Sequence, residues 1–186
     1  AGLKVFPIYQ TSNNYKEYFT EARGRRDAHY AFEALRDLYF PNGTTVYFAV
    51  DFDATVDDVN EYILPYFAAI KETYDSFATD KYKIGIYGPR YVCTLVRQAG
   101  YSESSFVCDM SSGFACNIGF ALPTDWAFDQ ISTITIGEGD GAIEIDNNIA
   151  SGRNEGARIN PETSSVVEEA DTYVKRLNIT SRVCSS

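Results

Sequence analysis

The sequence is poor in the side chains that build zinc centres. Histidine occurs once, at His29, and the four cysteines show no CxxC spacing. A zinc site needs several thiolate or imidazole ligands brought together. We therefore expect no bound metal, and no cofactor.

Basic residues and long apolar runs are also scarce. Lysine and arginine number 16 against 26 acidic residues, which leaves a net charge of -10. Such a surface repels phosphates and anionic lipid, so we expect neither nucleic acid nor a membrane as a partner. No apolar run is long enough to span a bilayer.

An initiator methionine, a visible signal peptide and internal repeats are missing as well. The chain opens with Ala1-Gly2-Leu3, which predicts either processing or a further segment upstream. What is present fits one domain with a sizeable core, since 186 residues contain 45% hydrophobic side chains. The 14 tyrosines fit either an aromatic core or sugar-contacting loops.

Short apolar runs alternate with segments of helical periodicity along most of the chain. This alternation predicts a parallel sheet covered on both faces. The expected strands are 3–9, 44–52, 82–87, 105–109, 126–131 and 142–145. The expected helices are 21–39, 57–77 and 90–99, with a last helix at 162–177 that begins after Pro161.

Four of these strands end in aspartate. Asp51 and Asp53 close one strand, and Asp109, Asp129 and Asp146 close three others. The carboxyl ends of parallel strands meet at one rim, where barrels and open sheets place their chemistry. Aspartate also caps helices and turns, which is the competing interpretation for each residue taken alone.

The pair Asp51 and Asp53 predicts acid–base chemistry. Residues i and i+2 of a strand project to the same side, so the two carboxyls are expected to lie close together. Like charges raise at least one pKa and create a proton donor beside an ionised partner, the combination that glycoside hydrolysis needs. Calcium binding is the alternative, with Asp146 and its neighbours Asn147 and Asn148 as further oxygen ligands.

Other polar and aromatic side chains lie at or near the predicted strand ends. They would form the floor and wall of a sugar site, although ordinary packing explains each one equally well. These residues are Tyr9, Gln10, Tyr87, Trp126 and Gln130.

Cysteines and glycosylation motifs indicate an oxidising compartment. An even cysteine count predicts two disulfides, and four buried free thiols are the alternative. Asn42 and Asn178 each begin an Asn-x-Thr motif, which fits a secreted glycoprotein. The cysteines are Cys93, Cys108, Cys116 and Cys184.

Six segments in order resemble a known family. They read GLKVFPIYQT, GTTVYFAVDFDA, YKIGIYGPRYVC, SSFVCDMSSGF, LPTDWAFDQISTITIG and IEIDNNIASGR. Together they resemble the glycoside-hydrolase-like barrel domain of secreted proteins, which is in turn similar to the peptidoglycan-cleaving lysozymes of glycoside hydrolase family 25. The resemblance covers residues 1–153 and leaves 154–186 as a linker and C-terminal helical extension.

The resemblance implies a fold of the α/β class, a TIM-like barrel with an acidic pocket at the carboxyl ends of its strands. Asp51 and Asp53 match the acidic pair of the fourth strand, where the lysozymes carry Asp-x-Glu with the glutamate as general acid. Asp109, Asp129 and Asp146 match later acidic positions on the rim.

The family's barrel also has two strands before the segment that opens this chain. Three sources could fill that gap: upstream sequence, a neighbouring chain, or the expected helix 162–177. Within the resemblance, Cys93 falls where the family often has cysteine, whereas Cys108 and Cys116 are additions. The pairing we expect from this is Cys108–Cys116 and Cys93–Cys184, although four cysteines allow three pairings and the sequence does not choose among them.

Two functions follow from the resemblance. The first is an extracellular, glycan-active domain that hydrolyses or binds a cell-wall-type polysaccharide, with Asp51 and Asp53 as the catalytic or stabilising pair. The alternative is a non-catalytic structural or adhesive protein that reuses the barrel and self-associates. Asp53 in place of glutamate and the missing strands favour that alternative.

Overall fold

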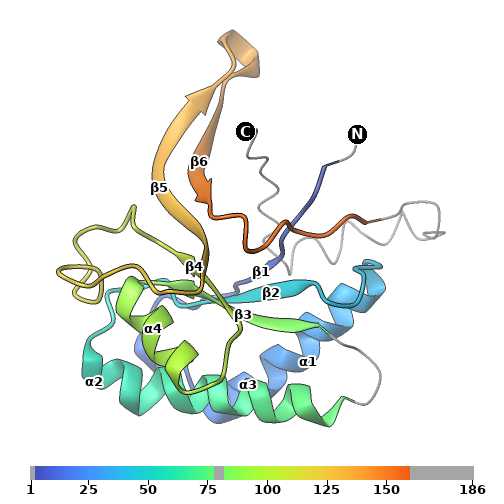
Figure 1. Ribbon diagram of the computed structural model, residues 1–186, viewed down its shortest axis with the longest axis vertical. Coiled ribbons are helices and arrows are strands. Elements are labelled where there is room, and N and C mark those ends of the chain that lie inside the picture. The colour runs from blue at the N-terminus through green and yellow to red at the C-terminus, as the bar shows by residue number, and fades with distance from the viewer. Residues whose placement is uncertain (1–2, 78–81, 160–186) are drawn as a thin grey trace.

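The computed structural model describes residues 3–77 and 82–159. Six strands form a single sheet in the order β1-β2-β3-β4-β5-β6 (Figure 1). The strands are β1 (Ile8–Tyr9), β2 (Thr45–Ala49), β3 (Lys83–Gly88), β4 (Ser104–Val107), β5 (Trp126–Ile136) and β6 (Ile143–Ala150).

The expected helices at 21–39, 57–77 and 90–99 form, with small shifts at their ends. Thr20 caps α1 by accepting a hydrogen bond from the Arg23 amide, and Gly100 follows α4 at a φ of 78°. Thr55 and Asp58 form a capping box before the second helical region. The helices are α1 (Glu21–Asp37), α2 (Val56–Asp58), a π-helical segment η2 (Val59–Ile63), α3 (Leu64–Ser76) and α4 (Arg90–Gln98), with short 3-10 turns η1 (Lys16–Tyr18) and η3 (Gly139–Gly141).

The sheet curls, and its two faces are covered differently. Helices α1, α3 and α4 lie on the outer face (Figure 1), where the larger core cluster packs. The inner face carries its own aromatic cluster, in which Phe6 stacks on Phe128 with ring centroids 4.1 Å apart. Since Phe6 precedes β1 and Phe128 lies on β5, this contact closes the curve across the inner face. The result is a six-stranded half-barrel, and the helices of the described residues cover its outer face.

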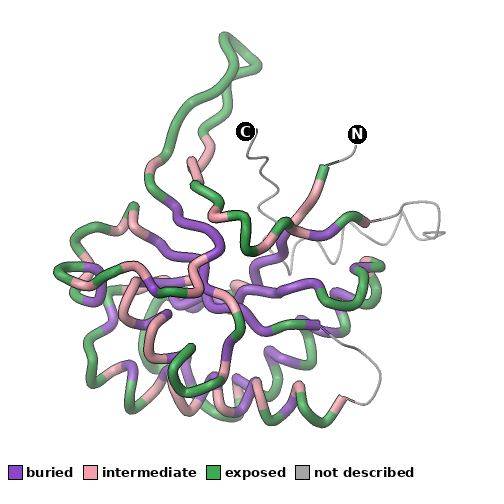
Figure 2. Tube along the Cα trace, viewed as in Figure 1, coloured by how far each residue is buried: buried purple, intermediate pink, exposed green. Residues whose placement is uncertain are grey.

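The last two strands differ from the expected parallel arrangement. β1 to β5 are parallel, but β6 pairs antiparallel with β5, with Ile134 opposite Ile145 and Ile136 opposite Ile143. The physical reason is the short connection, because a parallel neighbour would need a crossover of a dozen or more residues. Gly137, at a φ of 81°, supplies the turn. The resulting hairpin projects from the body, and its distal part is exposed (Figure 2).

The described part of the C-terminal region packs on the barrel. Val5 and Ala157 exchange two backbone hydrogen bonds of 2.8 and 2.7 Å, and Asn154 donates to the Tyr47 hydroxyl at 2.7 Å. Residues 154–159 therefore cover part of the open side of β1, where a linker was expected. The expected helix 162–177, with Asn178 and Cys184, lies outside the described residues.

Candidate functional site

The carboxyl ends of the first two strands meet as predicted. Gln10 directly follows β1, and Asp51 follows β2 after one intervening residue. The Gln10 Nε2 donates a hydrogen bond of 2.9 Å to Asp51 Oδ2. This bond ties two strand ends together and orients one carboxylate at the rim.

A second pair bridges β3 and β5 on the inner face. The Tyr87 hydroxyl donates a 2.6 Å hydrogen bond to Gln130 Oε1. Burial raises the pKa of Tyr87, and the nearby thiol of Cys108 and carboxylates of Asp51 and Asp146 raise it further. We call Gln10, Asp51, Tyr87, Gln130 and Asp146 the inner rim cluster.

Asp146 lies at a different position in its strand from the one predicted. It lies in the middle of β6 rather than at a strand end, opposite Thr133, whose hydroxyl is 3.5 Å from Asp146 Oδ1. Its half-buried carboxyl thus faces the rim from the projecting hairpin. The predicted strand direction was wrong, because β6 runs antiparallel to β5. The substrate-binding role of Asp146 stays a prediction.

Asp51 and Asp53 do not form the expected adjacent pair. β2 ends at Ala49, so the alternation of a strand does not extend to either aspartate. Asp53 is exposed, and its Oδ1 accepts a 2.6 Å hydrogen bond from the Ala115 amide. The two carboxyls are thus held by different segments, Asp51 by Gln10 and Asp53 by a loop beyond β4.

Asp109 and Asp129 form a separate acidic group beside α4. Arg90, the first residue of α4, chelates Asp109 through Nε at 2.7 Å and through Nη2. Asp129 is only 5% exposed, and within the described residues its Oδ1 has no hydrogen-bond partner. Because Asp129 precedes Gln130 on a strand, it projects to the opposite face. It therefore lies away from the inner rim cluster, contrary to the predicted sugar-contacting role.

Burial, with the neighbouring Asp109 carboxylate, raises the pKa of Asp129 to about 6. The folded state therefore binds this proton more tightly than the unfolded state, and stability is lost as pH rises from about 4 to about 6. Asp129→Asn should remove that loss. Relative to the parent, the variant is expected to gain about 2 kcal/mol between pH 4 and pH 7.5. Urea unfolding at both pH values measures this, and an equal difference at the two would contradict it.

Two predicted sugar contacts lie elsewhere. Tyr9 is 3% exposed, and its hydroxyl donates to the buried Asp27 at 3.3 Å on the helix side of the sheet. Trp126 is the first residue of β5, so it lies at the amino edge, about 13 Å along the strand from Gln130. There it stacks loosely with Arg153, whose guanidinium carbon is 5.9 Å from the ring centre. Both serve packing.

The cysteines do not form the implied pair. Cys93, Cys108 and Cys116 are buried free thiols, so the Cys108–Cys116 bond is not made. Burial raises the pKa of all three thiols, which keeps them in the neutral form. The alternative of buried free thiols therefore holds for these cysteines, and Cys184 lies outside the described residues.

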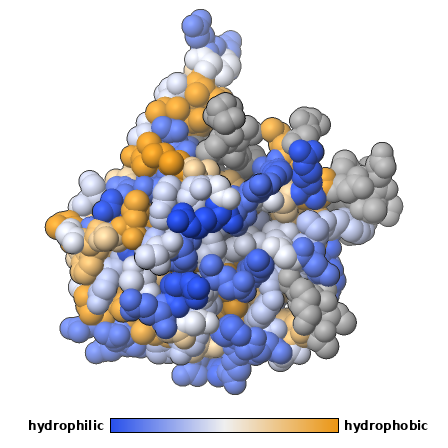
Figure 3. All heavy atoms as spheres, viewed as in Figure 1, coloured by the Kyte–Doolittle hydropathy of each residue, from blue (hydrophilic) through white to orange (hydrophobic). Residues whose placement is uncertain are grey.

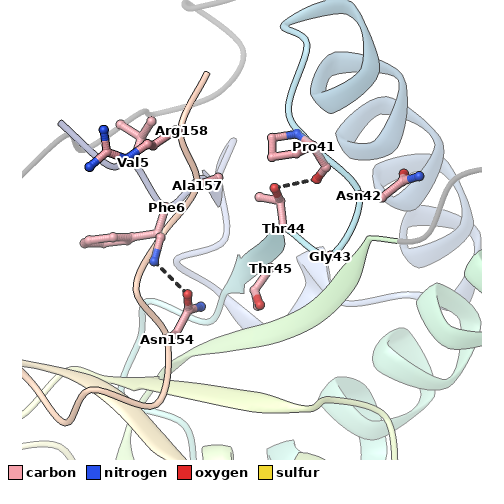
Figure 4. A pocket seen from close by; sticks show the side chains of 11 residues that line it. Val5, Phe6, Pro41, Asn42, Gly43, Thr44, Thr45, Asn154, Ala157 and Arg158 are labelled. Atoms are coloured by element: carbon pink, nitrogen blue, oxygen red, sulfur yellow. Dashed lines mark hydrogen bonds between the residues drawn. The ribbon is translucent and has the colours of Figure 1, made fainter. Parts of the chain in front are cut away.

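Two cavities of the described structure lie away from the rim. One of about 230 Å³ opens at the amino end of β2, between residues 41–45 and the segment 154–158 (Figure 4). Asn42 lies on its edge and is exposed, and the glycosylation there stays a prediction. The other, of about 290 Å³, lies between α4 and residues 120–125.

Two further findings concern metal sites and membrane-spanning helices. Within residues 3–77 and 82–159, no group of three or more histidine, cysteine or acidic side chains could hold a metal ion. The calcium alternative, which includes the side-chain oxygens of Asn147 and Asn148, stays a prediction. In the same part of the chain, no helix has the length and hydropathy required to cross a membrane.

The fold is of the α/β class, with a curled six-stranded half-barrel sheet, and comparison with known proteins identifies the family. The family described as the Rv2525c-like, glycoside hydrolase-like domain matches residues 1–150. The chain belongs to that family.

Two relatives come from Bacillus subtilis strain 168. The uncharacterized protein FadG is 51% identical over 156 residues, which cover 84% of this chain and 27% of that protein. The uncharacterized protein YbfG is 48% identical over 173 residues, or 90% of this chain and 24% of that protein. The chain thus spans about a quarter of the length of each.

Solved structures support the fold. The Mycobacterium tuberculosis Tat-secreted protein Rv2525c, in complex with L-tartrate, matches with a TM-score of 0.63 at 13% identity, over 84% of this chain and 72% of that one. A second crystal form, in complex with HEPES, matches with a TM-score of 0.62 at 15% identity, over 84% of this chain and 71% of that one. This likeness concerns the fold.

Sequence reasoning missed the residues that organise the rim from outside it. Arg90, at the start of α4, and Asn117, within the loop beyond β4, hold that loop in place. The sequence pattern around these two residues does not predict their contacts. One signal was available, because Arg90 follows the carboxyl end of β3 and so begins α4 beside the predicted acidic rim.

Proposed function

We propose that this domain binds and hydrolyses a cell-wall-type polysaccharide at its carboxyl rim. The inner rim cluster carries the proposal, because Gln10 orients the Asp51 carboxylate at the rim and the Tyr87 hydroxyl donates to Gln130. Polar groups of this kind match the hydroxyls of a sugar, and the family is glycoside hydrolase-like. The closer similarity to family 25 lysozymes stays a prediction.

In glycoside hydrolysis, Asp53 and Asp51 would have different roles. Asp53 would protonate the departing glycosidic oxygen through Oδ2, since Oδ1 is held by the Ala115 amide. Asp51, fixed by Gln10, would stabilise the positive charge that develops at the anomeric carbon. Tyr87 and Gln130 would hold the sugar hydroxyls.

Asp53→Asn and Asp51→Asn should each lower hydrolysis at least about 100-fold, because each removes a group that acts on the transition state. Reducing ends released from peptidoglycan and from chitin-type glycans measure the rate. Asp57→Asn is the matched control, since Asp57 is exposed on the same connection and contacts no rim residue in the described structure. Unchanged hydrolysis in Asp53→Asn would exclude the role of Asp53.

The second candidate function is structural or adhesive. Ile134, Ile136, Ile143 and Ile145 share one face of the β5–β6 hairpin, and the first three are 40%, 46% and 54% exposed. Figure 3 shows this hydrophobic surface along the projection. Exposed apolar faces mark association sites. Absence of hydrolysis on every glycan, with a native mass that rises with concentration, would favour this function over the first.

We also propose an extracellular location. The structural neighbour Rv2525c is described as Tat-secreted, and a polysaccharide of the cell wall is reached from outside the cell. Reducing conditions would leave the described thiols unchanged, so this location does not depend on disulfides.

A further inference from the structure

The loop between β4 and β5 holds Asp53 in place. Its Ala115 amide donates to Asp53 Oδ1 at 2.6 Å, although Ala115 and Asp53 lie 62 positions apart in the chain. Within the described residues, Asp53 Oδ2 has no hydrogen-bond partner. The orientation of this carboxyl therefore depends on where residues 109–120 place one backbone amide.

Arg90 fastens both ends of this loop. Its guanidinium chelates Asp109 at the start and donates from Nη1 to the Phe120 carbonyl at 2.8 Å at the end. A planar guanidinium can serve a carboxylate and a carbonyl at once, which a lysine ammonium does less well. Stacking of Tyr91 on Phe120, with ring centroids 4.2 Å apart, supports the same end.

Asn117 fastens the middle of the loop. It is 6% exposed, and its Oδ1 accepts the Arg90 amide at 2.8 Å. Its Nδ2 donates to the carbonyls of Cys108 at 3.0 Å and Ser111 at 2.9 Å. The Tyr91 amide adds a bond of 2.9 Å to the Cys116 carbonyl. The segment next to Ala115 is thus fixed to the first turn of α4.

We propose that Arg90 and Asn117 are positioning residues for Asp53: they fasten the loop 109–120 so that the Ala115 amide holds Oδ1 and leaves Oδ2 turned towards a substrate. The proposal rests on the proposed function of Asp53 as proton donor. It adds two residues that never touch the glycan, and it links the start of α4 to the geometry of a carboxyl that follows β2.

The Ala115 amide proton provides a readout that needs no substrate. In ¹⁵N–¹H NMR spectra, its shift should follow the titration of the Asp53 carboxyl, and Asp53→Asn should abolish that response. Arg90→Lys and Asn117→Ala should each reduce the amplitude at least about twofold, because the loop no longer holds the amide against Oδ1. In glycan hydrolysis, kcat should fall about tenfold or more with KM little changed.

Arg97→Lys is the matched control. Arg97 lies on the same helix but pairs with Asp125, at 3.7 Å, and has no described contact with residues 109–120. It should leave the Ala115 response unchanged. An unaltered response in folded Arg90→Lys or Asn117→Ala would overturn the proposal, as would a wild-type Ala115 amide that does not titrate. Altered amide responses in a protein that hydrolyses no glycan would uphold the positioning and reject the proposed reaction.

Discussion

Replacing Asp27 with alanine is expected to lower the free energy of unfolding by about 4 kcal/mol. Asp27 lies in α1 and is fully buried. It accepts hydrogen bonds from the hydroxyls of Tyr18 at 2.6 Å, Tyr66 at 3.0 Å and Tyr9 at 3.3 Å. Burial and the bond to Asp27 raise the pKa of Tyr18 to about 12, so its hydroxyl stays a donor. Alanine would leave the buried hydroxyls of Tyr9 and Tyr66 without their acceptor, and Tyr18 with only its 2.6 Å contact to the Thr11 hydroxyl.

Two variants of α1 separate this network from a general effect of the helix. Asp27→Asn keeps an acceptor oxygen and the shape of the side chain, so it should cost about half as much as alanine. Asp37→Ala removes a carboxyl at the end of the same helix that is 40% exposed, and it should change stability by less than about 1 kcal/mol. Urea unfolding compares the three. A loss below about 1 kcal/mol for Asp27→Ala would contradict the prediction.

Sequence periodicity predicted the elements but could not reveal this network. The apolar stripe with Ala28, Phe32 and Leu35 predicts a helix from residue 21 to 39, and α1 forms there. Asp27 is adjacent to that stripe and would ordinarily be expected in solvent. Its tyrosine partners come from β1, η1 and α3, so the stabilising contacts exist only after those elements pack.

The rim was predictable where it depends on strand order alone. Parallel β1 and β2 bring Gln10 beside Asp51, as strand ends require. The contact that holds Asp53 was harder to predict, because its partner Ala115 lies in a loop that has no periodic pattern. Asp146 shows a different limit. The apolar run at residues 142–145 predicts a strand without giving its direction, and only the short turn at Gly137 separates antiparallel from parallel pairing.

Gly24→Ala is expected to destabilise the fold by about 2–3 kcal/mol, although alanine favours a helix by about 1 kcal/mol over glycine. Gly24 lies where α1 crosses α3. A Cβ there would overlap the Tyr66 carbonyl oxygen and lie 3.1 Å from the Ala69 Cβ. The first of these atoms is backbone, so no side-chain rotation relieves the contact and the helices must separate. Gly141→Ala, with nothing within 4 Å of the added Cβ, is the control and should be nearly neutral.

The same separation would strain the Asp27 network, which makes the two sites interdependent. Tyr66 supplies both the carbonyl beside Gly24 and the hydroxyl that donates to Asp27 at 3.0 Å. Moving α3 away from α1 lengthens that bond, so part of the loss in Gly24→Ala is the loss that Asp27→Asn also causes. The double variant Gly24→Ala/Asp27→Asn should therefore lose less free energy of unfolding than the two single variants lose in sum, by about 0.5 kcal/mol or more. Strict additivity would show that the helix crossing and the buried carboxylate stabilise the fold independently.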